Sequence, residues 1–383
     1  MSMKFSFLNP TKIEFGQGQI ASIKNNIPKD SKVLVIYGGG SIKKNGVYDQ
    51  VVAALSEHTW QEFSGVEPNP TVETLDKAVA IVKQDGIDFI LAVGGGSVID
   101  GSKYVAAAAL YDGDGWDILL GKHQVKQAVA LGAILTIPAT GSESNGASVV
   151  TKAATQDKLA FISPLVFPKF AVMDPDVMKT LPQRQLANGI VDAFVHTCEQ
   201  YLTFPANAMV QDAYAESLLK ILAELAANFA HQDDAWRANL MWAANQALNG
   251  LIGAGVAQDW ATHMIGHELT AMYGVDHARS LAIIQPSLLR NQMAHKKAKL
   301  EQMGRNVFAL APSDTLAEQT IQAIEALYHS VDVATQLTEH GNDKTAAIDA
   351  IIAQLTKHGM LKMGEHQAIT LEKAKEILEA AVA

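Results

Sequence analysis

The sequence lacks the features of a disulfide-bonded or membrane-spanning protein. Among its 383 residues there is one cysteine, Cys198, so no internal disulfide can form, and a reducing compartment is expected. No apolar run has the roughly 18 residues, free of charges and helix breakers, that a membrane helix needs. The opening MSMKFSFLNP leads into a polar turn and does not read as a signal peptide. We therefore expect a cytoplasmic protein.

Positive charge is also scarce. Thirty Lys and Arg residues face 40 Asp and Glu residues, which gives a net charge of -10. This balance argues against nucleic acid or an anionic membrane as the main partner, although an anionic small molecule can still bind locally. Hydrophobic residues make up 48% of the chain. A large core and, at this length, two domains are expected.

Strand-like apolar runs are confined to the first half of the chain. Lys32–Tyr37, Asp88–Val93 and Ala133–Ile137 each end in a glycine-rich or polar turn. Helical patterns lie between them, at Val47–Leu55 and at Thr71–Gln84, where the first residue is a plausible N-cap. Continuous apolar strands that alternate with helices predict a parallel sheet covered on both faces.

After Leu181-Pro182 strand-like runs disappear, and the pattern is helical at Asn207–Asn228, Ala235–Leu251 and Thr315–Tyr328. We therefore predict an α/β dinucleotide-binding domain with a parallel sheet over residues 1–183. An all-α metal-binding domain is predicted over residues 184–383.

The three turns that follow the strands read GGGS (38–41), GGGSVID (94–100) and PATGSES (138–144). Glycine lets a backbone approach a phosphate closely, and a helix N-terminus presents free N–H groups. A single turn of this kind can be a tight strand–helix connection without a ligand. Parallel strands, however, bring such turns to one edge of a sheet, where nucleotides bind. In the second turn, Gly95, Gly96 and Ser97 would donate to a pyrophosphate, with Asp100 one turn into the helix.

The first turn bears on the choice between NAD and NADP. An acid after an early strand commonly binds the ribose 2′-hydroxyl of NAD. This turn carries no acid: Gly39 and Gly40 are followed by Ser41, Lys43 and Lys44. The two lysines favour a 2′-phosphate, hence NADP, although they could also be ordinary residues of a helix surface.

Three histidines, His263, His267 and His277, lie close together in DWATHMIGHELTAMYGVDH (259–277). On one straight helix, His263 and His277 would be about 21 Å apart, too far to share a metal. Gly274 can end the helix and let the chain turn back, so that a following helix presents His277. One or two imidazoles of the first helix could then join His277 at a single metal.

Upstream, Asp192 and His196 are four residues apart in NGIVDAFVHTCEQ and share a helix face. Alone they could be a hydrogen-bonded pair in the core. Together with the histidines downstream they predict a four-ligand nitrogen and oxygen site for a divalent transition metal.

With GGGSVID, PATGSES, NGIVDAFVHTCEQ and HMIGHELTAMYGVDHA in this order, nearly the whole chain resembles the iron-containing (group III) alcohol dehydrogenase family. The GGGS turn at 38–41 and the run ALNGLIGAGVAQDWATHMIGHELTAM are typical of its NADPH-dependent aldehyde reductase or butanol dehydrogenase branch. The resemblance implies a dinucleotide-binding domain, a helical domain and a site in the cleft between them.

The resemblance also assigns residues. It implies a metal, iron or zinc, bound by Asp192, His196, His263 and His277, and it places His267 near the nicotinamide. It sets Thr136, Thr140 and Ser142 near the ribose and nicotinamide, and Lys158 in the cofactor cleft. The turns and the resemblance together predict these NADP(H) contacts: Gly38, Gly39, Gly40, Ser41, Lys43, Gly95, Gly96, Ser97, Asp100, Thr136, Thr140, Ser142 and Lys158.

The expected reaction is the reversible reduction of small aldehydes to primary alcohols by hydride transfer from NADPH, with the metal as Lewis acid. His267 is the candidate proton relay; its alternative role is a hydrogen bond that positions His263. A homodimer or higher homo-oligomer is expected. The alternatives are a glycerol dehydrogenase-like or dehydroquinate synthase-like enzyme of the same architecture, and a non-catalytic nucleotide-binding regulator.

Overall fold

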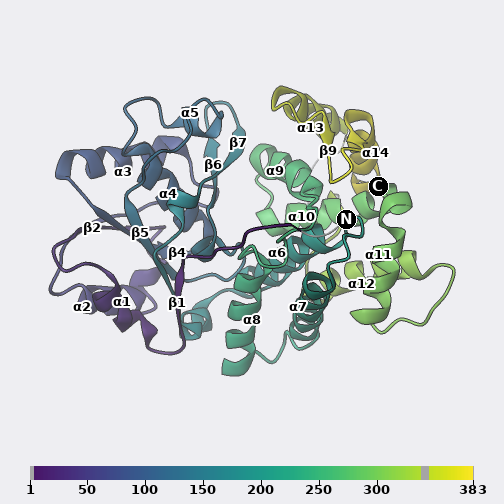
Figure 1. Cartoon of the computed structure of the whole chain (residues 1–383), viewed down its shortest axis with the longest axis horizontal. Coiled ribbons are helices and arrows are strands. Elements are labelled where there is room, and N and C mark those ends of the chain that lie inside the picture. The colour runs from purple at the N-terminus through teal and green to yellow at the C-terminus, as the bar shows by residue number, and fades with distance from the viewer. Residues whose placement is uncertain (1–3, 338–344, 383) are drawn as a thin grey trace. The chain divides into compact units, whose positions relative to one another are not determined.

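The computed structural model describes residues 4–337 and 345–382, and the chain divides into two compact units. Unit 2 consists of Leu8–Pro182 with Asp233–Asn245, and unit 1 consists of Met1–Phe7, Gln183–Gln232 and Gln246–Ala383 (Figure 1). No helix within the described residues is long and apolar enough to cross a membrane.

Unit 2 contains the predicted parallel sheet. Its strands run in the order β1-β8-β5-β4-β2-β3, and every neighbouring pair is parallel. The central strands are almost wholly buried, which explains why they read as continuous apolar runs. The strands are β1 (Lys12–Phe15), β2 (Lys32–Tyr37), β3 (Thr59–Phe63), β4 (Phe89–Gly94), β5 (Ala130–Leu135) and β8 (Phe170–Met173).

The helices of unit 2 cover both faces of this sheet. The strand order reverses after β3, so right-handed crossovers place α2 on one face and both α3 and α4 on the other. Contacts within unit 2 agree, because α3 packs on α4 whereas α2 packs on α1. Thr71 caps α3 as predicted, and its hydroxyl accepts from the Thr74 N–H. The helices are α1 (Ile23–Asn26), α2 (Val47–Ala54), α3 (Val72–Asp85), α4 (Gly96–Ala108) and α5 (Trp116–Leu119).

Two details of unit 2 differ from the sequence prediction. The third predicted strand is displaced, because β5 ends at Leu135 and Ile137 lies beyond it in the turn. In addition, β6 (Ala147–Lys152) and β7 (Asp157–Ile162) form a separate antiparallel pair that the prediction missed. Their alternation of buried and partly exposed residues differs from the continuous apolar pattern on which the strand prediction rested.

Unit 1 is helical, with one short exception. The two-residue strands β9 (Lys362–Met363) and β10 (Ile369–Thr370) pair antiparallel, so this region is not purely α-helical. The helices that begin after Pro182 are α6 (Gln183–Tyr201), α7 (Met209–Ala227), α8 (Asp234–Ala247), α9 (Ala261–Tyr273), α10 (His277–Asn291), α11 (Met293–Asn306), α12 (Leu316–Ser330), α13 (Thr345–Lys357) and α14 (Leu371–Val382). Of these, α8 lies almost wholly within unit 2.

The hydrophobic core of unit 1 forms around α9 and α10. Ile265 and Leu269 of α9 and Ile283 of α10 are fully buried in one cluster with Ile351 of α13 and Ile377 of α14. Well-packed apolar neighbours hold these helices rigidly. The backbone that carries the polar residues on the other faces of α9 and α10 is therefore held in a fixed position.

Candidate metal centre and cofactor turns

Helix α6 supplies the first two candidate metal ligands. Asp192 and His196 lie one turn apart in its interior, and their side chains are only 2% and 4% exposed. Burying a carboxylate costs free energy unless a partner or a metal compensates. A buried acid beside an imidazole, at a point where other imidazoles converge, therefore indicates a ligand set.

The turn after α9 brings the other two ligands together. Gly274 adopts the left-handed conformation (φ 66°, ψ 17°), and its N–H closes the helix on the Thr270 carbonyl. Helix α10 then begins at His277. Asp276, just before it, accepts hydrogen bonds from Arg184 and Asn188 of α6. The predicted helix break and chain reversal are confirmed, and α10 is tied to α6.

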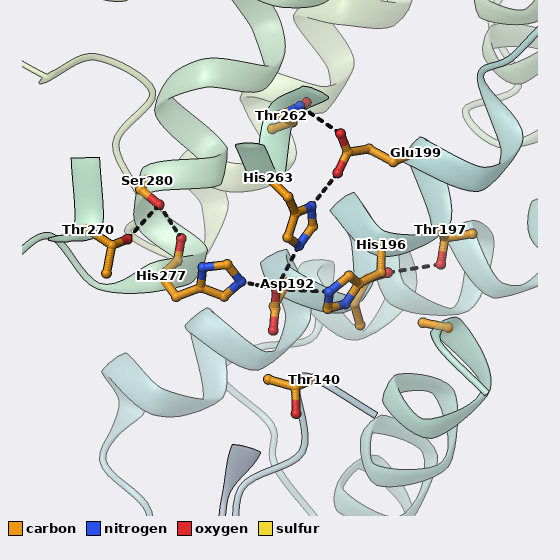
Figure 2. Close-up of polar contacts among 12 residues, drawn as sticks. Thr140, Asp192, His196, Thr197, Glu199, Thr262, His263, Thr270, His277 and Ser280 are labelled. Carbon is orange, nitrogen blue, oxygen red and sulfur yellow. Dashed lines mark hydrogen bonds and ion pairs between the residues drawn. The ribbon is translucent and has the colours of Figure 1, made fainter. Parts of the chain in front are cut away.

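Asp192, His196, His263 and His277 converge on one point (Figure 2). The Oδ1 of Asp192 lies 3.6 Å from His196 Nε2, 3.5 Å from His277 Nε2 and 4.0 Å from His263 Nε2. Metal–ligand bonds of 2.0–2.2 Å in a tetrahedron place ligand atoms about 3.3–3.6 Å apart. Two of these distances match and the third is slightly wider, so the donor set fits a divalent metal.

Burial affects the protonation of these four side chains and their exposure to solvent. It lowers the pKa of His196 to about 4, an effect that neighbouring His263 reinforces and Asp192 opposes. The ring is therefore neutral near pH 7, the form in which imidazole binds metals. The side chain of His277 is 24% exposed, whereas the other three are nearly sealed. The set is thus most accessible beside His277.

Glu199 also belongs to this centre, and the sequence prediction missed it. One carboxylate oxygen accepts from the Thr262 N–H at 2.7 Å, and the other contacts His263 Nδ1. Burial and the nearby Asp259 carboxylate raise the pKa of Glu199 well above its usual range. The available signal was spacing, since Asp192, His196 and Glu199 follow the i, i+4, i+7 pattern of one helix face.

His267 lies beside two of the candidate ligands. Its ring centroid is 6.0 Å from that of His263 and 5.2 Å from that of His277. It follows His263 by one turn of α9. Glu199 contacts His263 Nδ1, so a group other than His267 is available to orient that ring.

In unit 2 the second and third turns are packed against each other. Gly95, the N-cap residue of α4, is extended, and a Cβ there would lie 3.0 Å from Ile137. A Cβ on Gly96 would lie 2.6 Å from the side chain of Thr140. A larger residue at Gly96 would displace Thr140, and one at Gly95 would press on Ile137. Thr136, just after β5, is buried, and its N–H donates to the Gly94 carbonyl.

Asp100 links α4 to the third turn. Its carboxylate accepts from the Ser142 hydroxyl at 2.5 Å and from the Val149 N–H at 3.0 Å. Lys103, which the sequence prediction did not include, is fully buried and donates to Ser142 and Asn145. Burial lowers the pKa of Lys103 to about 8, an effect that Asp100 opposes. These contacts fix the shape of the turn.

Asn69, another residue that the prediction missed, hydrogen-bonds to both Lys158 and Ser97. Lys158 donates to the Asn69 side chain at 2.9 Å, and the Asn69 N–H donates to the Ser97 hydroxyl at 3.3 Å. Asn69 has a φ of 56°. The Asn-Pro pair at 69–70 was the available turn signal.

The first turn contains the predicted glycines and lysine but also meets an acid. Gly40 is left-handed, Ser41 begins a short 3₁₀ turn, and Gly39 has open space around it. A Cβ on Gly38 would lie only 3.1 Å from the Val66 carbonyl oxygen. Lys43 lies 3.1 Å from Glu62 of β3. The turn itself carries no acid, but the neighbouring strand places one beside Lys43, which corrects the argument that the absence of an acid favours a 2′-phosphate.

Comparison with known proteins gives consistent matches along the chain. Residues 10–175 match the model of the family described as iron-containing alcohol dehydrogenase, and residues 186–382 match that of the Fe-containing alcohol dehydrogenase C-terminal region. The chain is 49% identical to the NADPH-dependent aldehyde reductase YqhD of Escherichia coli (strain K12), over 98% of this chain and 99% of that protein. It is 39% identical to the probable NADH-dependent butanol dehydrogenase 1 of Bacillus subtilis (strain 168), over 99% of both. The crystal structure of E. coli YqhD superposes with a TM-score of 0.97 at 48% identity, over 99% of both chains.

Proposed function

Because the chain belongs to the iron-containing alcohol dehydrogenase family, we propose that it reduces small aldehydes to primary alcohols, reversibly, with NADPH and one divalent metal. The observation that carries this proposal is the convergence of one carboxylate and three imidazoles, whose ligand atoms all lie within 4.8 Å of one another. An oxygen and nitrogen set of this kind suits iron or zinc.

The coenzyme assignment rests on the first turn and on the relative with 49% identity, which is named for NADPH. Lys43 stands over the rings of Tyr37 and Tyr48 and beside Glu62. Lys43 offers a cation to a 2′-phosphate, whereas the Glu62 carboxylate beside it opposes that anion, so this turn supports NADPH less than the sequence alone suggested. The relative with 39% identity is named for NADH, so the ratio of the two coenzyme activities has to be measured.

In this proposal each part of the chain has a separate task. A bound divalent cation supplies a Lewis acid that stabilises the negative charge developing on the carbonyl oxygen. Asp192, His196, His263 and His277 hold that cation. His267 passes a proton to the alcohol oxygen, directly or through water, since an imidazole titrates near neutral pH. The glycines of the second turn bind the pyrophosphate.

The alternatives are less well supported. The relatives are named as an aldehyde reductase and a butanol dehydrogenase, which does not favour a glycerol dehydrogenase-like or dehydroquinate synthase-like enzyme. Dehydroquinate synthase-like chemistry would also need a glutamate with two histidines as ligands, and here the acid among the candidate ligands is Asp192. A regulator that only binds nucleotide would not need a metal centre.

One assay tests the proposal. Purified protein is mixed with NADPH and butanal, the absorbance of the reduced nicotinamide is followed, and the metal content is measured on the same sample. We expect turnover that disappears on chelation and returns with Fe²⁺ or Zn²⁺. The ratio of kcat/KM for NADPH to that for NADH should exceed about ten, a free-energy difference of about 1.4 kcal/mol. Full activity in a rigorously demetallated sample would refute the proposal.

Two further expectations belong to the proposal. We propose a cytoplasmic location, supported by the single buried Cys198. We also propose a homodimer or higher homo-oligomer, which light scattering on the purified chain tests directly.

A further inference from the structure

We propose that Glu199 is a positioning residue that fixes the ring of His263 with Nε2 toward the metal. This inference rests on the proposed metal centre and extends it by one residue. Glu199 follows His196 by three positions on α6, so one helix carries two ligands and the group that orients a third. Figure 2 shows its carboxylate between Thr262 and His263.

The first argument is that Glu199 uses both carboxylate oxygens on the same segment. One oxygen accepts from the backbone N–H of Thr262 in the first turn of α9, and the other contacts Nδ1 of the next residue, His263. The N-terminus of a helix has unsatisfied N–H groups and attracts negative charge. The carboxylate therefore fixes the start of α9 and the ring of its ligand together.

The α9 N-terminus needs this external acceptor. Its N-cap residue, Trp260, has a φ of 62° and makes no side-chain cap hydrogen bond. Asp259 accepts from the Ala261 N–H at 2.9 Å, and Glu199 accepts from the next N–H along, that of Thr262. Two carboxylates thus share the first turn of α9, and only Glu199 reaches the ligand.

The second argument concerns the two nitrogens of His263. Nε2 faces the metal position, 4.0 Å from Asp192 Oδ1, whereas Nδ1 faces Glu199. When Nε2 of a neutral imidazole binds a metal, its proton resides on Nδ1 and needs an acceptor. A carboxylate in that place fixes the tautomer and ring orientation and makes the imidazole a stronger ligand.

A buried framework holds Glu199 in place. The Asp259 N–H donates to the Glu199 backbone carbonyl at 2.9 Å. The Asp259 carboxylate in turn accepts from Lys296, which also donates to the Leu202 carbonyl just beyond α6. These contacts fix the segment before α9 against the end of α6, so the carboxylate of Glu199 has little freedom to leave His263.

The test is Glu199→Gln in the full chain, with Zn²⁺ as probe and affinity measured by chelator competition. The Thr262 N–H and the His263 ring contact different oxygens of Glu199, so in the amide one of these two donors would face an NH₂ group in place of an acceptor. We expect the Zn²⁺ dissociation constant to rise about 10–100-fold. The matched control is Glu268→Gln, because Glu268 is equally buried, lies on α9 and contacts a histidine, His358, at 2.7 Å. The control should bind Zn²⁺ like the unmodified chain.

The outcomes separate this inference from the proposed function. If the unmodified chain binds no Zn²⁺, the metal centre itself fails. If it binds Zn²⁺ and Glu199→Gln binds equally well, or if Glu268→Gln loses as much affinity, the positioning role is refuted. Should Glu199→Gln not fold, ¹⁵N spectra of the Zn²⁺-loaded unmodified chain still decide. They should show His263 protonated at Nδ1, and coordination through Nδ1 would overturn the inference.

Discussion

His267 is the residue whose role is easiest to separate from metal binding. Its ring stands 5.2 Å from that of His277 and 6.0 Å from that of His263, centroid to centroid, and it lies outside the four-ligand group. We predict that His267→Ala retains the metal but lowers kcat about 10²–10⁴-fold, the usual contribution of a general acid. Metal content and steady-state rates measure the two effects. Exposed His295→Ala serves as the control and should change neither. Loss of metal in His267→Ala would make it a structural part of the centre.

Glu365 should give the stability of unit 1 a particular pH dependence. Its carboxylate lies 3.1 Å from Lys296 and beside Asp259 and His366. Burial and the hydrogen bond to Asp259 raise the pKa of Glu365 to about 7. Because the unfolded-state pKa is lower, the folded chain binds more protons between about pH 4.5 and 7. The stabilisation is therefore fully present below this window and is lost as pH rises through it.

Urea unfolding of the unmodified chain and of Glu365→Gln at matched metal content tests this prediction. The amide resembles the protonated acid, so the variant lacks this titration. The stability of the unmodified chain relative to the variant should fall with pH across the window, by at most about 1.4 kcal/mol per pH unit. Parallel stability curves would mean that Glu365 titrates normally.

At the scale of elements, the turn between α9 and α10 determines where His277 lies. Gly274 has a φ of 66° and no neighbouring atom within 4 Å of a Cβ built on it, so Gly274→Ala introduces strain but no clash. The expected loss of stability is about 1–2 kcal/mol. Because His277 follows three residues later, Zn²⁺ affinity should fall as well. Thermal unfolding and chelator competition measure the two effects.

Gly86 provides the control for this turn. It ends α3 in unit 2 with a φ of 63° and equally open surroundings. Gly86→Ala should cost the same stability and leave Zn²⁺ affinity unchanged. If Gly274→Ala also left the affinity intact, the helix end would not constrain His277.

The turn between α9 and α10 also shows how much of the structure can be predicted from the sequence. Gly274 carries a local signal, and so do the buried runs at β2 and β4; these elements were predicted within a residue or two. The β6–β7 pair was missed because its strands are only partly buried. Spacing along two helices and the turn between α9 and α10 indicated a metal site, whereas the choice of His263 over His267 as a ligand came from the family resemblance. Glu199 was not predicted, because its contact with His263 spans 64 residues and depends on how α6 packs on the α9 N-terminus.

Glu62 was missed for a similar reason. It comes after the helix that follows the first turn, and pairing of β2 with β3 brings it alongside. Lys43 therefore faces an acid that its own turn does not contain. Pairing between strands decides such neighbours, and a single sequence does not reveal it.

For the whole molecule, the division predicted at residue 183 remains a prediction, and α8 offers a way to examine it. Asn245 near its end donates at 2.7 Å to Glu143 and to Ser144, in the third turn of unit 2. The next residue, Gln246, accepts from Tyr214 within unit 1. Two adjacent residues of one helix therefore make their hydrogen bonds in different units, although the predicted boundary assigns both residues to the C-terminal domain.

We predict that Asn245→Ala weakens unit 2 specifically. Glu143 is buried, burial raises its pKa, and the Asn245 hydrogen bond opposes that effect. Removing this donor should cost about 1–3 kcal/mol. The Kd for NADPH should rise, since the third turn loses its support, while Zn²⁺ affinity is unchanged. Gln246→Ala, with its contact in unit 1, should leave NADPH binding intact. If Asn245→Ala instead lowered Zn²⁺ affinity and spared NADPH, α8 would function with the helical domain, as the boundary at residue 183 implies.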